Sequence, residues 1–182
     1  MNGELMFPRQ FAVSPQRENM HAYCLYCETK RAEEIAAFIQ KDTGYRCLSP
    51  QIIQRKWVRG EPQEVRHRWL PGYIFIYTDE PIIPEFRYRG VIRCLGRDEL
   101  SGGDLKVAEA IYRSDGIIGI VRLAEVGDRC KVDDPAWAGF TGTVIKLDRG
   151  RKRCCISFEF DKVMRNVWVG YEMVIPADGP TT

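Results

Sequence analysis

The chain is poor in the residues that build catalytic or metal centres. Among its 182 residues there are only two histidines, His21 and His67, far apart in sequence. One Cys-x-x-Cys is present, Cys24 to Cys27, but no second Cys or His pair follows that would complete a tetrahedral zinc site. The sequence also has no glycine-rich phosphate loop, no nucleophile elbow and no catalytic pair of carboxylates. These absences weigh against an enzyme, and we expect no metal or other cofactor.

Long hydrophobic runs are missing too. Charged residues or proline interrupt every apolar stretch before the roughly 18 residues that a membrane helix needs, so we expect no membrane partner. The formal net charge is only +2, so any binding to nucleic acid has to come from local clusters of Lys and Arg. Seven cysteines, an odd number, without an export signal predict reduced thiols and a cytoplasmic protein.

The Cys-x-x-Cys leaves one alternative of another class open, a thiol-redox or zinc protein. On an extended strand, residues three apart point to opposite faces, so the thiols of Cys24 and Cys27 would diverge. The adjacent residues Cys154 and Cys155 meet the same objection. We therefore expect structural cysteines.

The apolar pattern divides the chain into two parts. Residues 1–20 read as a disordered leader, and strands alternate with helices over 21–114. After a linker at 115–122 the pattern becomes all-β over 123–176, with a tail at 177–182. In the first part we expect strands at 23–27, 45–48, 52–58, 65–69, 73–77 and 92–95, a hairpin turn at 59–62, and helices at 29–43, 84–88 and 104–116.

The all-β part contains the most specific pattern in the chain. Apolar and polar residues alternate over 126–132 and again after Thr143, as in half-buried strands. Gly139 and Gly142 stand where a tightly curled small barrel needs positive φ or close backbone approach. The segment Val126–Ile145 resembles the KOW motif, an element that binds nucleic acid and protein in transcription elongation factors and some ribosomal proteins.

Four further segments resemble the NusG family of transcription elongation factors. They are AYCLYCETK at 22–30, QRKWVRGEPQEV at 54–65, LPGYIFI at 70–76 and GVIRCLG at 90–96. The resemblance implies an α+β fold: an NGN-like domain, with an antiparallel sheet and flanking helices, followed by an SH3-like KOW barrel. Within the family, 148–153 and 169–174 look most like the LoaP type of operon-specific antiterminator. The apolar, strand-like residues of the second part favour a permanent barrel, loosely tethered, over the helical hairpin of the RfaH type.

The family resemblance implies that the N-terminal domain binds the clamp helices of RNA polymerase. The matching positions are Tyr26, Leu70, Tyr73 and Val91. The resemblance thus predicts a processive antitermination factor on selected operons, and we expect a monomer. The alternative within the family is a general elongation factor whose KOW domain binds a termination factor or the ribosome.

Two basic clusters are candidate nucleic-acid sites. The first, the hairpin cluster, lies on the predicted hairpin, interleaved with Trp57 and Trp69, and suits non-template DNA at the transcription bubble; its members are Arg55, Lys56, Arg59, Arg66 and Arg68. The second, the barrel cluster, lies at the tip of a predicted KOW hairpin and suits an RNA hairpin; its members are Lys146, Arg149, Arg151, Lys152 and Arg153. Solvated charge on an exposed edge is the alternative for both.

Overall fold

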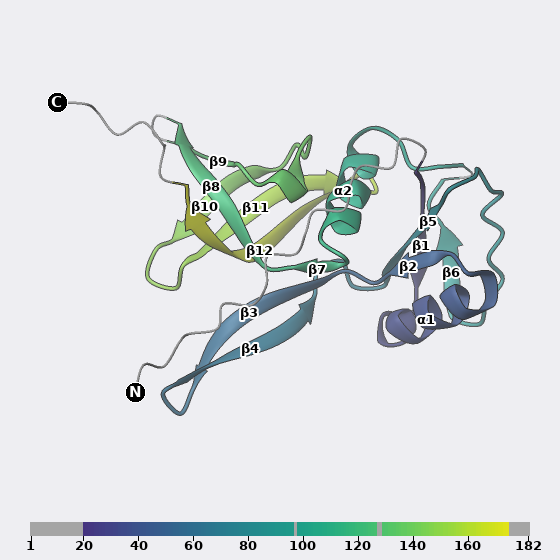
Figure 1. Ribbon diagram of the computed structural model, residues 1–182, viewed down its shortest axis with the longest axis horizontal. Coiled ribbons are helices and arrows are strands. Elements are labelled where there is room, and N and C mark those ends of the chain that lie inside the picture. The colour runs from purple at the N-terminus through teal and green to yellow at the C-terminus, as the bar shows by residue number, and fades with distance from the viewer. Residues whose placement is uncertain (1–19, 97, 127–128, 175–182) are drawn as a thin grey trace, which may run out of the picture.

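The computed structural model describes residues 20–96, 98–126 and 129–174. The expected leader, apart from residue 20, and the expected tail lie outside the described residues. Three sheets and two α-helices contain most of the described residues (Figure 1). No helix within these ranges is long and apolar enough to cross a membrane.

The first sheet is antiparallel, with strand order β2-β5-β1-β6. Its strands are β1 (His21–Cys27), β2 (Arg46–Leu48), β5 (Tyr73–Thr78) and β6 (Val91–Cys94). Helix α1 (Ala32–Thr43), preceded by a 3-10 turn η1 (Thr29–Arg31), covers one face. Its apolar residues Ala32, Ile35, Ala36 and Ile39 recur at helical spacing and are buried. Gly44 ends the helix in the left-handed region at φ 76°.

The second sheet is a long hairpin joined by a short strand from the expected linker. Strands β3 (Gln51–Val58) and β4 (Glu61–Arg68) are antiparallel, and β7 (Ile117–Ile118) pairs in parallel with Gln51 and Ile52. The turn is only Arg59 and Gly60, at φ 54° and 86°, as a two-residue hairpin loop requires. It is therefore shorter than the turn predicted at 59–62.

The third sheet is five-stranded, with order β10-β11-β12-β8-β9. Its strands are β8 (Ile120–Val126), β9 (Arg129–Val132), β10 (Thr143–Asp148), β11 (Arg153–Phe160) and β12 (Val163–Met173), with a 3-10 turn η2 (Pro135–Trp137). Its edge strands β9 and β10 contact each other, so the sheet curls into a small barrel. Gly142 has no room for a side chain, because a Cβ there would lie 2.1 Å from the Phe140 ring.

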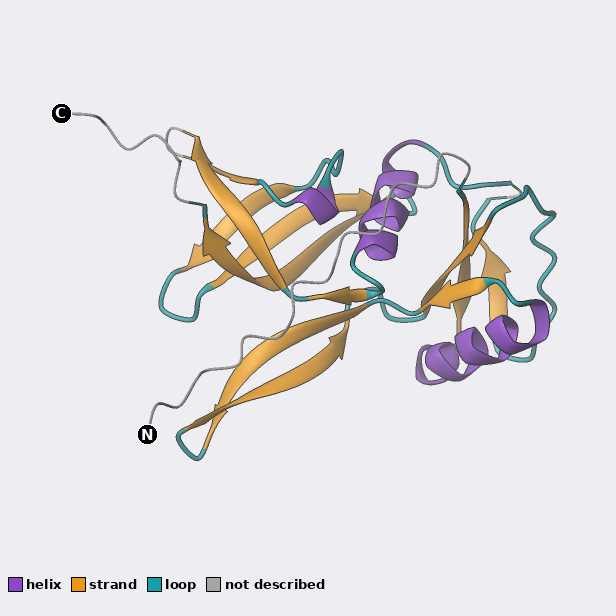
Figure 2. Cartoon of the chain, viewed as in Figure 1, coloured by secondary structure: helices purple, strands orange, loops and turns teal. Residues whose placement is uncertain are grey.

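Helix α2 (Gly102–Arg113) lies between the first sheet and the barrel (Figure 2). The Tyr77 hydroxyl of β5 donates to the Ala108 carbonyl at 2.8 Å, and the Arg113 guanidinium donates to the Ala138 carbonyl at 3.1 Å. One hydrophobic core therefore runs from the first sheet through α2 into the barrel, where it includes Phe158 and Phe160.

Two expectations about the connections are wrong. The segment 84–88 forms no helix. The Ile83 carbonyl accepts from the Glu85 N–H at 2.8 Å, only two residues on, and this tight turn gives Pro84 a backbone conformation that a helix cannot include. The barrel is not loosely tethered either, because it shares its core with the first sheet and the expected linker at 115–122 contains β7 and the start of β8.

Candidate functional site

Three of the four predicted polymerase-binding residues belong to the core on the side of the first sheet opposite α1: Tyr26 and Tyr73 from the sheet, and Leu70 from the connection before β5. The rings of Tyr26 and Tyr73 are 5.0 Å apart between centroids, and the Tyr73 N–H donates to the Leu70 carbonyl at 3.1 Å. Gly72 makes this approach possible: at φ +87°, a Cβ would lie 2.8 Å from the Cys27 carbonyl and 2.9 Å from the Tyr26 ring. We call Tyr26, Leu70 and Tyr73 the aromatic surface.

Val91 does not join the aromatic surface. It pairs with Cys27 across a register shift in β1 and packs into the second core, under α1, with residues such as Ile35. Side chains alternate between the faces of a strand, so Val91 faces away from Tyr26. The structure thus separates it from the other three positions.

The barrel covers the aromatic surface. Leu70 is only 3% exposed and Tyr73 only 5%. Phe160, at the end of β11, lies 5.2 Å from the Tyr73 ring and 5.5 Å from the Phe75 ring. Trp69 packs 5.4 Å from Phe158, also on β11. These residues make an aromatic core between the first sheet and the barrel.

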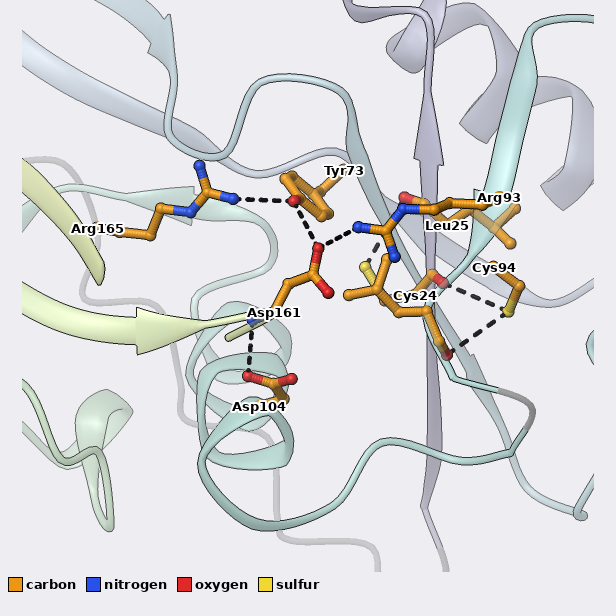
Figure 3. Close-up of polar contacts among 9 residues, drawn as sticks. Cys24, Leu25, Tyr73, Arg93, Cys94, Asp104, Asp161 and Arg165 are labelled. Carbon is orange, nitrogen blue, oxygen red and sulfur yellow. Dashed lines mark hydrogen bonds and ion pairs between the residues drawn. The ribbon is translucent and has the colours of Figure 1, made fainter. Parts of the chain in front are cut away.

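A polar network lies beside this aromatic core (Figure 3). Asp161 Oδ2 accepts hydrogen bonds from the Tyr73 hydroxyl, at 3.0 Å, and from the Arg93 guanidinium. The Arg165 guanidinium donates to the same hydroxyl at 2.9 Å, and the Asp161 N–H donates to Asp104 Oδ1 at 3.2 Å. Residues of β5, β6 and α2 are thereby joined to one hairpin of the barrel.

Burial and charge in this network change the acidity of two groups. Burial, followed by the hydrogen bond to Asp161, raises the pKa of Tyr73 to about 12. Burial also raises the pKa of the Asp104 carboxyl, although the hydrogen bond from the Asp161 N–H opposes the shift. Both shifts follow from the exclusion of water between the sheet and the barrel.

The turn that carries Asp161 has an unusual backbone. Asp161 and Lys162 have φ of 53° and 59°, the left-handed conformation of a two-residue hairpin turn. Glycine would adopt it without strain, whereas a side chain at this φ carries a cost. The Asp161 carboxylate offsets that cost through its bonds to Tyr73 and Arg93.

The hairpin cluster is only partly available to a ligand. Arg59 is exposed at the turn and Arg66 is exposed on β4, but the Arg68 guanidinium bonds to Glu33 Oε1 at 3.1 Å. Arg55 and Lys56 lie in β3, and their side chains, like that of Trp57, are outside the described part. Trp69 is buried between the sheet and the barrel, so it cannot stack on a base in this conformation.

The barrel cluster surrounds a well-ordered turn between β10 and β11. Asp148 accepts from the Arg151 N–H at 3.1 Å and from the Arg153 Nε at 3.0 Å, and these bonds lower its carboxyl pKa. The Arg149 side chain is 79% exposed, with its guanidinium 3.8 Å from Glu125. Lys152 adopts φ 48° in the same turn. The tip predicted from sequence is thus present, and its cations project outward.

Sequence reasoning missed Trp168, which lies beside two members of this cluster, Arg153 and Lys146. The Arg153 guanidinium is 4.7 Å from the centre of the Trp168 ring, and the Lys146 ammonium is 6.0 Å from it. The sequence Val167-Trp168-Val169 could have indicated this position. Side chains alternate between the faces of a strand, so a buried Val169 places Trp168 on the outside of the barrel.

The cysteines take structural positions. Cys24 belongs to the core that faces the barrel and Cys27 to the core under α1, as the strand geometry predicts. Burial raises the pKa of Cys24 well above its usual value and that of Cys27 to about 11. Both thiols are therefore protonated at neutral pH, which weighs against a thiol-redox pair. In the described ranges, no three His, Cys, Asp or Glu side chains are grouped to hold a metal ion.

Comparison with known proteins gives a likeness among solved structures. No protein-family model matches the chain, and no curated protein matches it. Among solved structures, it is similar to NusG from Thermotoga maritima ("Domain interaction in Thermotoga maritima NusG"), at 16% sequence identity and a TM-score of 0.46. The alignment covers 83% of this chain and 93% of that chain. It is a likeness of fold.

Proposed function

We propose that this chain is a NusG-type transcription elongation factor that binds RNA polymerase through the aromatic surface. The observation that carries the proposal is the contact between the rings of Tyr26 and Tyr73, with Leu70 buried in the same core. The family resemblance assigns all three residues to polymerase binding. Tyrosine supplies a large contact area at little conformational cost and is enriched at the centres of protein interfaces. Val91 has no part in this contact.

In this proposal the N-terminal part, 21–114, is the polymerase-binding NGN-like domain and 123–176 is the KOW domain. The barrel covers the aromatic surface through Phe160 and Asp161, so polymerase has to displace it. The apparent affinity for polymerase is then the intrinsic affinity reduced by the fraction of molecules in which the barrel has moved away.

We further propose that the KOW domain binds RNA, so that the chain acts as a processive antitermination factor on selected operons. Support comes from the outward cations Arg149, Arg151 and Lys152, which the Asp148 carboxylate holds in a fixed turn. Arg59 and Arg66 of the hairpin are exposed and can contact non-template DNA. Phosphate contacts by such residues position a nucleic acid without reading its sequence.

Polymerase binding is tested by mixing the full chain with purified RNA polymerase and measuring complex formation. Tyr26→Ala is compared with Phe38→Ala, a matched aromatic truncation on α1 that is 55% exposed on the other side of the sheet. Both variants carry Asp161→Asn, so that closure by the barrel does not mask the result. We expect Tyr26→Ala to weaken binding about tenfold or more and Phe38→Ala to leave it unchanged. Equal binding by both folded variants would exclude the aromatic surface as the contact.

A further inference from the structure

The outer face of strands β10 to β12 places an aromatic ring among cations. Lys146, Cys155 and Trp168 lie opposite one another on three neighbouring strands. Cys155 is only 5% exposed, although its neighbours Cys154 and Ile156 face the core, which places Cys155 on the outer face of the strand. Trp168 itself is half-buried and remains accessible to a ligand. This row is independent of the contact between the barrel and the first sheet.

The Arg153 guanidinium is held beside Trp168 before any ligand arrives. Arg153 lies over the indole ring at 4.7 Å while its Nε donates to Asp148 at 3.0 Å. The same carboxylate fixes the turn through the Arg151 N–H. Five cations, Lys146, Arg149, Arg151, Lys152 and Arg153, stand here against the carboxylates of Asp148 and Glu125, so the surface carries an excess of positive charge.

Trp168 also lies where the barrel meets the β3–β4 hairpin. The Gln54 side-chain amide of β3 donates to the Trp168 carbonyl at 3.3 Å, and β3 contacts β12 along this stretch. In Figure 1 the hairpin leaves the molecule beside β12. Contacts therefore connect Arg153 through Trp168 to Gln54. They lie between the two basic clusters, which are about 100 residues apart in the sequence.

We propose that this surface is a binding site for an unpaired segment of RNA, with Trp168 as its stacking platform. An unpaired base stacks on an indole or on a guanidinium plane, and here the two lie together. Lys146 and the turn at 149–153 bind the flanking phosphates. A paired stem hides its base faces and offers only phosphates and shape. The inference rests on the proposed binding of RNA to the barrel and adds the class of RNA that the site selects.

The test compares two RNAs with the full chain by fluorescence anisotropy. One is a hairpin with a loop of uridines, and the other is a blunt duplex that contains the same stem sequence, lengthened by further base pairs until it carries the same number of phosphates. Trp168→Ala should weaken hairpin binding about tenfold and hardly change duplex binding, while Trp168→Phe stays close to wild type. Phe38→Ala, the exposed aromatic far from this face, should change neither. A DNA hairpin with a thymidine loop tests whether the site prefers RNA.

The double variant Arg151→Glu/Lys152→Glu separates this inference from the function on which it rests. It should weaken the binding of both RNAs and make that binding less dependent on salt concentration, because phosphate contacts are lost. Loss in the double variant together with wild-type binding by Trp168→Ala would overturn the stacking platform and leave RNA binding in place. Equal losses for hairpin and duplex in a folded Trp168→Ala would overturn it as well. If the wild-type chain binds neither RNA, both proposals fail.

Discussion

The Tyr73 hydroxyl donates to Asp161 at 3.0 Å and accepts from Arg165 at 2.9 Å, so two barrel residues hold one tyrosine of the first sheet. The same tyrosine is the centre of the proposed polymerase contact. Its ring cannot serve both partners at once, because it is 5% exposed in the closed arrangement. If polymerase binds as proposed, it competes with the barrel for this residue.

Asp161→Asn should favour opening of the barrel. Asparagine tolerates the left-handed backbone of the turn, so the substitution mainly removes the charge that faces Arg93. A hydrogen bond to a charged group contributes about 1.5–3 kcal/mol, so the apparent affinity for polymerase should rise about ten- to a hundredfold. The measurement is a binding titration with purified polymerase. Asp133→Asn, a carboxylate elsewhere on the barrel, is the control, and an affinity equal to wild type in Asp161→Asn would contradict competition.

Phe160→Ala should lower the free energy of unfolding strongly. The side chain is fully buried and packs against Tyr73 and Phe75, so its removal leaves a cavity between sheet and barrel. We expect a loss of about 3–5 kcal/mol in urea denaturation. Phe38→Ala, at an exposed position where the ring makes an edge contact with Tyr88, should cost only about 0.5–1.5 kcal/mol. Similar losses for the two variants would mean that Phe160 is not packed as described.

The pKa of the Tyr73 hydroxyl should show whether the barrel covers this residue in solution. Its folded-state pKa is raised to about 12, above the ordinary value of 10.0, so ionisation opposes the closed state. The stability that Tyr73 contributes is complete below pH 10 and is lost as the pH rises towards 12. Ultraviolet titration of wild type minus Tyr73→Phe isolates this group from Tyr77 and Tyr88. A difference curve centred near 10 would show that the barrel does not cover Tyr73 in solution.

Gly72→Ala should disrupt the aromatic surface. The new Cβ meets the Cys27 carbonyl and the Tyr26 ring at a backbone φ of +87°, so the variant should lose more than about 1 kcal/mol of stability. Gly103→Ala is the matched control: it lies in α2 with nothing within 4 Å of its Cβ, and it should be neutral or slightly stabilising. Denaturation curves for the two variants provide the comparison, and equal stabilities would contradict the crowding at Gly72.

Local features of the fold were predictable because they rest on neighbouring residues. The periodicity of α1, its stop at Gly44 and the β3–β4 hairpin all follow from short stretches of sequence. The burial of Trp69 depends on Phe158, and that of Tyr73 on Phe160, each almost 90 residues further on. The continuous apolar run of β5 indicates that both of its faces are buried, but not that a barrel covers one of them. The position of Val91 was missed because a register shift in β1 decides its face.

The short strand β7 limits how the barrel can move. Ile117 and Ile118 remain hydrogen-bonded beside β3, and Gly119 alone separates them from the first barrel strand at Ile120. While β7 stays paired, uncovering Tyr73 is a rotation about a one-residue pivot, and the barrel stays within reach of its own docking place. If β7 separates from β3, the connection to the barrel becomes longer by at most about 3.5 Å for each residue released. The pairing of Ile117 and Ile118 with β3 therefore limits how far the barrel can move from the first sheet to reach a second partner.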